Sequence, residues 1–138
     1  MEEVIHAVGH PAVRATHAST LEVTTDDYLT PAGDCIVGIE ADRAPADFDP
    51  AFVAACRDEA ARIRVALEAD GFRDTLAARG DPALTFDDER GAVVRTSTHV
   101  DGRTVAVGAD AAAADLDRRL VEALADGALL VVTLSVDP

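Results

Sequence analysis

The chain has 138 residues and a formal net charge of −14, because 26 acidic residues stand against 12 basic ones. This length predicts one domain over residues 1–138, and a composition of 49% hydrophobic and 28% charged residues excludes a disordered chain. There is no apolar stretch of about 18 residues, and the start, Met1-Glu2-Glu3, lacks the basic region of a signal peptide. We therefore expect no membrane span and a cytoplasmic location.

The charged residues are of unusual types. All 12 basic residues are Arg, and Asp makes up 18 of the 26 acidic residues. The loss of every Lys is a trend of the whole surface, so it predicts adaptation to a salt-rich cytoplasm rather than a patch for a basic partner. In molar salt the Debye length falls to about 3 Å, which screens the self-repulsion. Counterion release from nucleic acid gains little there, and aromatic residues are only 4% of the chain, so we do not expect nucleic-acid binding.

The first half of the chain predicts three strands, at residues 3–8, 19–25 and 34–41. In the second of these, Leu21 and Val23 alternate with polar residues, so they should point into the core. In the third, the residues expected on one face are Cys35, Val37 and Ile39.

A helix should follow the third strand. Asp49 is a good N-cap, Pro50 suits the first helical position, and Gly71 is a natural stop. Apolar residues at spacings of three and four predict the buried stripe of this helix. They are Phe52, Cys56, Ala60, Ile63 and Leu67.

The clearest hairpin signal lies in residues 92–100 and 103–108. Asp101-Gly102 between them has the composition of a two-residue type I′ loop, which fixes the register of both strands. This register places three polar side chains on one face: Arg95, Ser97 and His99. Arg103 would then lie on the other face, as an exposed residue beside the turn.

Three more elements complete the prediction. Residues 83–87 favour a short strand, and Asp110 is expected to cap a second helix through Asp126, which Gly127 ends. Residues 129–136 predict a last strand with one buried apolar face.

A local repeat joins the two halves. Residues 40–49 and 108–117 match at six of ten positions, and in both a strand runs into an Ala-Asp turn before a helix. One interpretation is chance in a segment rich in Ala and Asp. The other is a duplicated strand-strand-helix unit about a pseudo-twofold axis. Both predict the α+β class, an antiparallel-rich sheet with two α-helices on one face.

Two histidines mark the first candidate site. If the first two strands are neighbours, His10 and His17 lie on opposite limbs of their connection, about 5 Å apart. They would then act as acid and base or share a metal, with Glu22 or Asp34 as a third group. The alternative is a surface loop in which both imidazoles hydrogen-bond to turns. The spacing His-x6-His matches no known zinc pattern.

A second candidate is an anion site on the predicted hairpin. A guanidinium fork at Arg95 and a hydroxyl at Ser97 suit phosphate or carboxylate, although an exposed strand with a salt bridge to Asp would look the same. Cys35 resembles a nucleophile, but its neighbour Asp34 disfavours a thiolate, so we expect a core residue. Cys56 is also expected in the core, with both thiols reduced.

Familiar motifs are missing. The sequence has no Gly-x-Gly-x-x-Gly, no Walker loop and no Gly-x-Ser-x-Gly elbow, so we expect no nucleotide cofactor of the usual kinds and no hydrolase of that type. A divalent metal stays open as a cofactor.

Several runs resemble the archaeal family called domain of unknown function 371. The resemblance implies an archaeal, cytoplasmic, single-domain protein, and the absence of Lys suggests a haloarchaeal member; it carries no activity with it. The family's usual Lys in the two Ala-Asp turns is replaced here by Arg43 and Ala111. The runs are Gly9-His10-Pro11-Ala12-Val13-Arg14-Ala15-Thr16-His17, Thr20-Leu21-Glu22-Val23-Thr24, Leu29-Thr30-Pro31-Ala32-Gly33-Asp34-Cys35-Ile36-Val37-Gly38, Gly80-Asp81-Pro82-Ala83-Leu84-Thr85, Val94-Arg95-Thr96-Ser97, Arg103-Thr104 and Ala109-Asp110-Ala111-Ala112-Ala113.

Three hypotheses for function follow from these residues. The first is an enzyme or binding protein for a small anionic metabolite, with His10 and His17 as acid and base, Glu22 or Asp34 orienting one imidazole, and Arg95 with Ser97 holding the anion. The second is a divalent-metal site at His10, His17 and Asp34. The third is a non-enzymatic, oligomeric interaction module that uses exposed strand edges. The sequence identifies no reaction.

Overall fold

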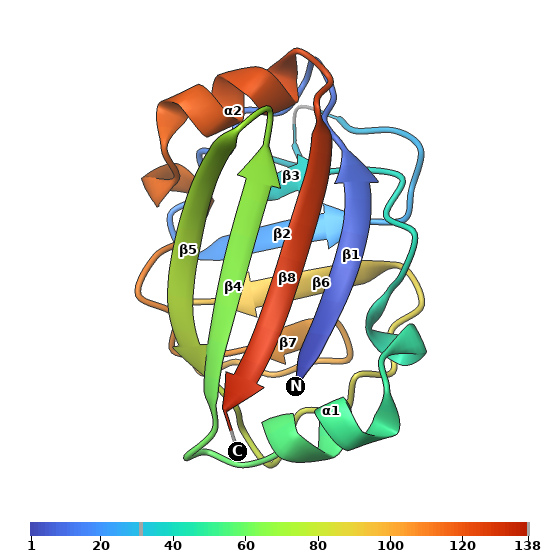
Figure 1. Cartoon of the computed structure of the whole chain (residues 1–138), viewed down its shortest axis with the longest axis vertical. Helices are drawn as coiled ribbons and strands as arrows, with labels where there is room; N and C mark the ends of the chain where they lie inside the picture. Colours follow the sequence, from blue (N-terminus) through green and yellow to red (C-terminus); the bar gives the residue numbers. More distant parts are fainter. Residues whose placement is uncertain (31, 138) are drawn as a thin grey trace.

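Two four-stranded sheets, crossed over one another, make up the computed structural model of the chain, which describes residues 1–30 and 32–137 (Figure 1). The first sheet is antiparallel and has the order β1 (Glu2–Val8), β8 (Leu129–Asp137), β4 (Arg62–Ala69), β5 (Phe72–Arg79). The second has the order β3 (Ile36–Gly38), β2 (Thr20–Thr24), β6 (Gly91–Arg95), β7 (Thr104–Ala106). The predicted α+β class is confirmed, with two sheets in place of the one expected.

The helices close the two ends of this structure rather than covering one face of a sheet. Figure 1 shows α1 (Pro50–Cys56) at the end where β1 begins and α2 (Arg118–Ala125) at the opposite end. Each follows a short 3₁₀ turn, η1 (Pro45–Asp47) or η2 (Ala113–Asp115). The inner faces of the two sheets therefore bury each other. None of the helices in the described residues has the length and apolar character needed to cross a membrane.

The chain is built from two matching repeats. The first repeat runs through β1, β2, β3, η1, α1 and β4, and the second runs in the same order through β5, β6, β7, η2, α2 and β8. The strand orders of both sheets are unchanged when the repeats are exchanged, so β4 with β8 and β2 with β6 pair across a pseudo-twofold axis. The duplicated unit is thus larger than strand-strand-helix: it has four strands and a helix.

The repeated Ala-Asp turns have a structural task. Asp42 Oδ1 accepts a hydrogen bond from His6 N at 2.8 Å, and Asp110 Oδ1 accepts one from Ala77 N at 3.0 Å. In return, the backbone N–H groups of Asp42 and Asp110 donate to the carbonyl oxygens of His6 and Ala77. These bonds occupy part of the outer edges of β1 and β5, which blunts the strand-edge pairing that an interaction module would use.

The long first helix predicted through Leu67 is wrong. The helix ends at Cys56, and β4 begins at Arg62. The alternation of Ile63 with later apolar residues fits a strand as well as a helix, and pairing on both sides by β5 and β8 decides for the strand. Asp70 and Gly71, with φ of 51° and 80°, make the two-residue hairpin loop to β5 rather than a helix stop.

The predicted hairpin around Asp101-Gly102 is also wrong. β6 and β7 are parallel, with Val93 in register with Thr104, so residues 96–103 cross over instead of turning back. Asp101 caps this crossover: its carboxylate accepts from Arg103 N and Thr104 Oγ1. The composition Asp-Gly is shared by hairpin loops and by ordinary capped turns, and here the second applies.

The bounds of the other predicted elements differ less from those in the structure. The strands at residues 3–8, 19–25 and 129–136 are confirmed, with Leu21 and Val23 buried. The third strand is shorter than expected, residues 83–87 form no strand, and the second helix begins at Arg118 with Asp117 as its N-cap. Thr24, one of the polar residues of the second strand, is buried at 3% exposure, and its hydroxyl accepts a hydrogen bond from Asp26 N.

Candidate functional site

The outer face of the second sheet carries the polar cluster. Glu22 projects from β2 on the face opposite Leu21 and Val23, directly across from Val93 of β6. Its side chain is only 13% exposed. Gly91 makes room for it, since a Cβ there would lie 2.7 Å from Glu22 Oε2. The carboxyl group of Glu22 therefore packs against the backbone of β6 at Gly91 rather than extending into solvent.

The environment of Glu22 favours its protonated form. Burial raises the pKa of Glu22 above its ordinary value of 4.5, while the positive charges of Arg103 and Arg95 act in the opposite direction. The negative charges of Asp88 and Asp101 add to the effect of burial. A carboxyl group with a raised pKa at a partly open surface is suited to accepting and donating a proton.

Arg95 is held in place by its neighbours. Its Nε donates to Thr104 Oγ1 and its Nη2 to Asp101 Oδ2, both at 2.9 Å, and the side chain is 11% exposed. Although burial opposes it, the hydrogen bond from Arg103 N and the charge of Arg95 hold the pKa of Asp101 below 3.8. Arg95 thus anchors the crossover loop and has little reach left for a ligand.

Arg103 is the functional candidate that sequence reasoning missed. Its Nη1 lies 3.6 Å from Glu22 Oε1 and its Nη2 lies 3.4 Å from Asp101 Oδ2, while 46% of the side chain stays exposed. The expected hairpin would have placed it as exposed decoration. The crossover between the parallel strands β6 and β7 instead brings Arg103 next to Glu22 of β2. Residues 96–103 contain no local sequence pattern that predicts this crossover.

These groups border a polar hollow of about 260 Å³. Arg90 closes one side, bound through Nη2 to both carboxylate oxygens of Asp26 at 2.8 Å. The lining residues are Glu22, Thr24, Asp26, Asp88, Arg90, Gly91 and Arg103. The hollow therefore offers an acid–base group together with two partly exposed guanidinium groups.

The two histidines serve turns. His10 Nδ1 accepts from Ala12 N at 3.0 Å, and His17 Nδ1 accepts from Ser19 N at 3.2 Å and Thr20 N at 3.1 Å. The second repeat makes the same bonds with carboxylates. Asp81 Oδ1 accepts from Ala83 N at 2.8 Å, and Asp88 Oδ2 accepts from Arg90 N and Gly91 N. His10 and His17 therefore occupy capping positions, which the match between Gly9-His10-Pro11-Ala12 and Gly80-Asp81-Pro82-Ala83 already signals.

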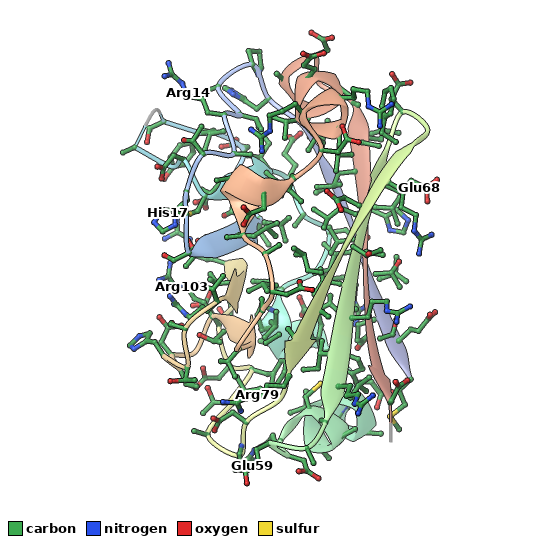
Figure 2. All side chains as sticks on the ribbon, turned by 90° about the vertical axis from the view of Figure 1, so that its left-hand side faces the viewer. Arg14, His17, Glu59, Glu68, Arg79 and Arg103 are labelled. Carbon is green, nitrogen blue, oxygen red and sulfur yellow. The ribbon has the colours of Figure 1, made fainter. Side chains whose placement is uncertain are left out.

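The premise that placed the histidines together is wrong, because β1 and β2 belong to different sheets. His17 lies with Arg103 on the side of the second sheet that faces away from the first (Figure 2). Asp34 adjoins His17 through its backbone, since its carbonyl accepts from His17 N at 3.3 Å. Within residues 1–30 and 32–137, no three His, Cys, Asp or Glu side chains come together as a metal site. The predicted set His10, His17 and Asp34 is therefore not assembled in this structure.

Three candidates from the sequence remain: Ser97, Cys35 and Cys56. Ser97 is exposed and its hydroxyl accepts from His99 N at 3.3 Å, in the crossover loop beyond the end of β6. Cys35 is half-buried rather than in the core, with Sγ 3.9 Å from Glu22 Oε1. Burial and the charge of Glu22 raise the pKa of this thiol, so it is a poor nucleophile. Cys56 is in the core as expected, and burial raises its pKa to about 12.

The comparisons with known proteins assign the chain to one family. The sequence matches the domain of unknown function DUF371 over residues 5–137, so the chain belongs to that family. It is similar to an uncharacterized protein of the archaeon Methanocaldococcus jannaschii, with 39% identity over 136 residues. This match covers 99% of the present chain and 100% of the relative.

Proposed function

We propose that the outer face of the second sheet binds a small anionic metabolite, bearing phosphate or carboxylate, and that Glu22 exchanges a proton with it. One observation carries the proposal: a carboxyl group with a raised pKa, 13% exposed, borders a polar hollow that two partly exposed arginines also line. The arrangement supplies both a proton and a counter-charge for a ligand.

Each side chain has a distinct role in this proposal. Arg103 binds the anionic group and holds it near the carboxyl group of Glu22. One of its guanidinium nitrogens lies close to Glu22, and nearly half of its side chain is exposed. Arg90, which is paired with Asp26, is the second arginine at the hollow. Arg95 and Asp101 are positioning residues, since they fix the loop that carries Arg103. His17 and Asp34 border the same face, whereas His10 and Ser97 take structural places in their loops.

A thermal-shift screen tests this site. Phosphorylated and carboxylated metabolites are added to the protein in molar KCl, because a ligand that binds the native state raises the melting temperature. We expect a compound that stabilises the wild type and fails to stabilise Glu22→Gln and Arg103→Gln. Glu68→Gln is the matched control, because Glu68 lies on the opposite side of the molecule (Figure 2). The proposal is contradicted if every compound that stabilises the wild type stabilises the Glu22→Gln and Arg103→Gln variants equally.

We also propose that the protein works in the salt-rich cytoplasm of a haloarchaeon, as one domain. The absence of Lys and the net charge of −14 support the first part. A hydrophobic cluster that joins residues of both repeats supports the second. Unfolding followed at increasing KCl should show a melting temperature that rises from low to molar salt in one transition. A temperature independent of salt would contradict the salt adaptation.

A further inference from the structure

The outer face of the first sheet holds two arginines, Arg62 and Arg64, that form no ion pair with the acidic residues of the described part of the chain. Arg62 and Arg64 lie two residues apart on β4, on the face opposite Ile63 and Val65, and both are exposed. Glu68 lies on this same face of β4 and points away from the second sheet (Figure 2). Among the described residues, neither Arg62 nor Arg64 has a carboxylate oxygen within 4.0 Å or a hydrogen bond through its side chain.

This arrangement is unfavourable by itself. Like charges on one strand face repel, and Arg62 and Arg64 are neighbours on the same face of β4. The chain has 26 acidic residues available for pairing, and six of its 12 arginines do form ion pairs within the described part: Arg43, Arg79, Arg90, Arg95, Arg103 and Arg119. A negative group between Arg62 and Arg64 would remove the repulsion.

Space for such a group is present. A hollow of about 390 Å³ opens on this face, and small residues in register with β4 leave it free of bulk: Ala77 of β5 and Ser135 of β8 both pair with Arg64. The side chain of Ser135 adds a hydroxyl group to the lining of this hollow, in register with Arg64. Asp137, in register with Arg62, also lines the hollow.

We propose that this hollow binds a small oxyanion that carries its own hydroxyl group, such as hydrogen phosphate or a phosphate monoester. Arg62 and Arg64 donate to the oxyanion, and Ser135 supplies a further hydrogen bond. Asp137 would repel a bare anion, but it accepts from the P–OH of a hydrogen phosphate. The site lies on the sheet opposite the Glu22 hollow and does not depend on the function proposed there.

The test is a titration with inorganic phosphate, followed by the backbone amide signals of the full chain in NMR at constant KCl. We expect saturable shifts around Arg64, Ala77 and Ser135, and an affinity at least about tenfold lower in the Arg62→Gln, Arg64→Gln double variant. Arg73→Gln is the matched control, since Arg73 is exposed, lies on β5, does not line the hollow, and has no ion pair among the described residues. It should leave the affinity unchanged.

Three results would overturn the proposal. They are the absence of saturable shifts at millimolar phosphate, equal affinity in the double variant, and saturable shifts around Glu22 and Arg103 alone. The last result would assign phosphate to the hollow on the second sheet, so the two sites are distinguished in one experiment. Circular dichroism of the double variant, with a spectrum equal to that of the wild type, is the control that separates a loss of affinity from a loss of folding.

Discussion

The first repeat, β1 to β4, and the second, β5 to β8, use the same backbone hydrogen bonds but present different side chains at the centre of the second sheet. Glu22 of the first repeat lies opposite Val93, its counterpart across the pseudo-twofold axis. Around them, Thr24 is the counterpart of Arg95, and His17 that of Asp88. The core pairs stay apolar, as with Val37 and Val105. Divergence at this face, where packing does not require it, favours a site there.

The caps of the two repeats also explain part of the composition. Within the part of the chain that the structure describes, eleven Asp side chains accept a backbone N–H, at turns, helix starts and strand edges. Asp is short enough to bond to its own turn, whereas Glu is not favoured there. The excess of Asp over Glu is therefore largely a property of this loop-rich, duplicated fold. The absence of Lys is not explained by capping, and it remains the observation behind the proposed adaptation to salt.

The largest effect should come from two equivalent glycines. A Cβ on Gly9 would lie 1.9 Å from Leu124 O, and one on Gly80 would lie 2.0 Å from Cys56 O, so backbone must move in both cases. We expect Gly9→Ala and Gly80→Ala each to lower the free energy of unfolding by about 3 kcal/mol. Urea unfolding measures this. A loss in only one of the two variants would break the equivalence of the repeats.

The ion pair between Arg43 and Glu3 in the first repeat has no counterpart at the equivalent, described positions of the second. Arg43 Nη1 donates to Glu3 Oε1 at 2.7 Å, and the Glu3 side chain is only 7% exposed, whereas the second repeat has Ala111 and Asp74 at these places. Arg43→Ala leaves a buried carboxylate unpaired and should lower the free energy of unfolding by about 2 kcal/mol. Ala111→Arg is the matched control, with a change within about 0.5 kcal/mol in the same assay. Equal effects of the two substitutions would contradict the asymmetry.

The raised pKa of Glu22 predicts a pH-dependent difference between wild type and Glu22→Gln. The folded state holds this proton more tightly than the unfolded state, so the contribution of Glu22 to stability is fully present below pH 4.5 and is lost as the pH rises through the higher, folded-state pKa. The free energy of unfolding of Glu22→Gln should therefore improve relative to wild type from acidic toward neutral pH. Urea unfolding at several pH values checks this, with Glu22→Val showing the same trend. A difference that does not change with pH would contradict it.

The smallest effects should come from exchanging capping residues between repeats. His17→Asp installs the residue that caps the equivalent turn at position 88, so the free energy of unfolding should change by less than about 0.5 kcal/mol. His17→Ala removes the acceptor and should cost about 1 kcal/mol. Thermal unfolding of both variants makes the comparison. If His17→Asp is as destabilising as His17→Ala, the imidazole has a role beyond the cap.

The candidate site was only partly predictable from the sequence. Glu22 was accessible to sequence reasoning, because it is the one carboxylate in an otherwise alternating strand. Arg103 was not, since its position depends on the crossover between β6 and β7. The pairing of Arg95 with Ser97 assumed a hairpin that the chain does not form, and the pairing of His10 with His17 assumed neighbouring strands.

Local patterns in the sequence determined the elements with a clear period, such as β1, β2, β8 and the core face of α2, and they indicated the duplication through the Ala-Asp turns. Only the tertiary structure decided that residues 62–69 are a strand, that β6 and β7 are parallel, and that the strands divide into two crossed sheets. The physical reason is that Asp-Gly turns and short apolar runs are compatible with several structures. Burial against a partner strand, which lies far away in the sequence, selects one of them.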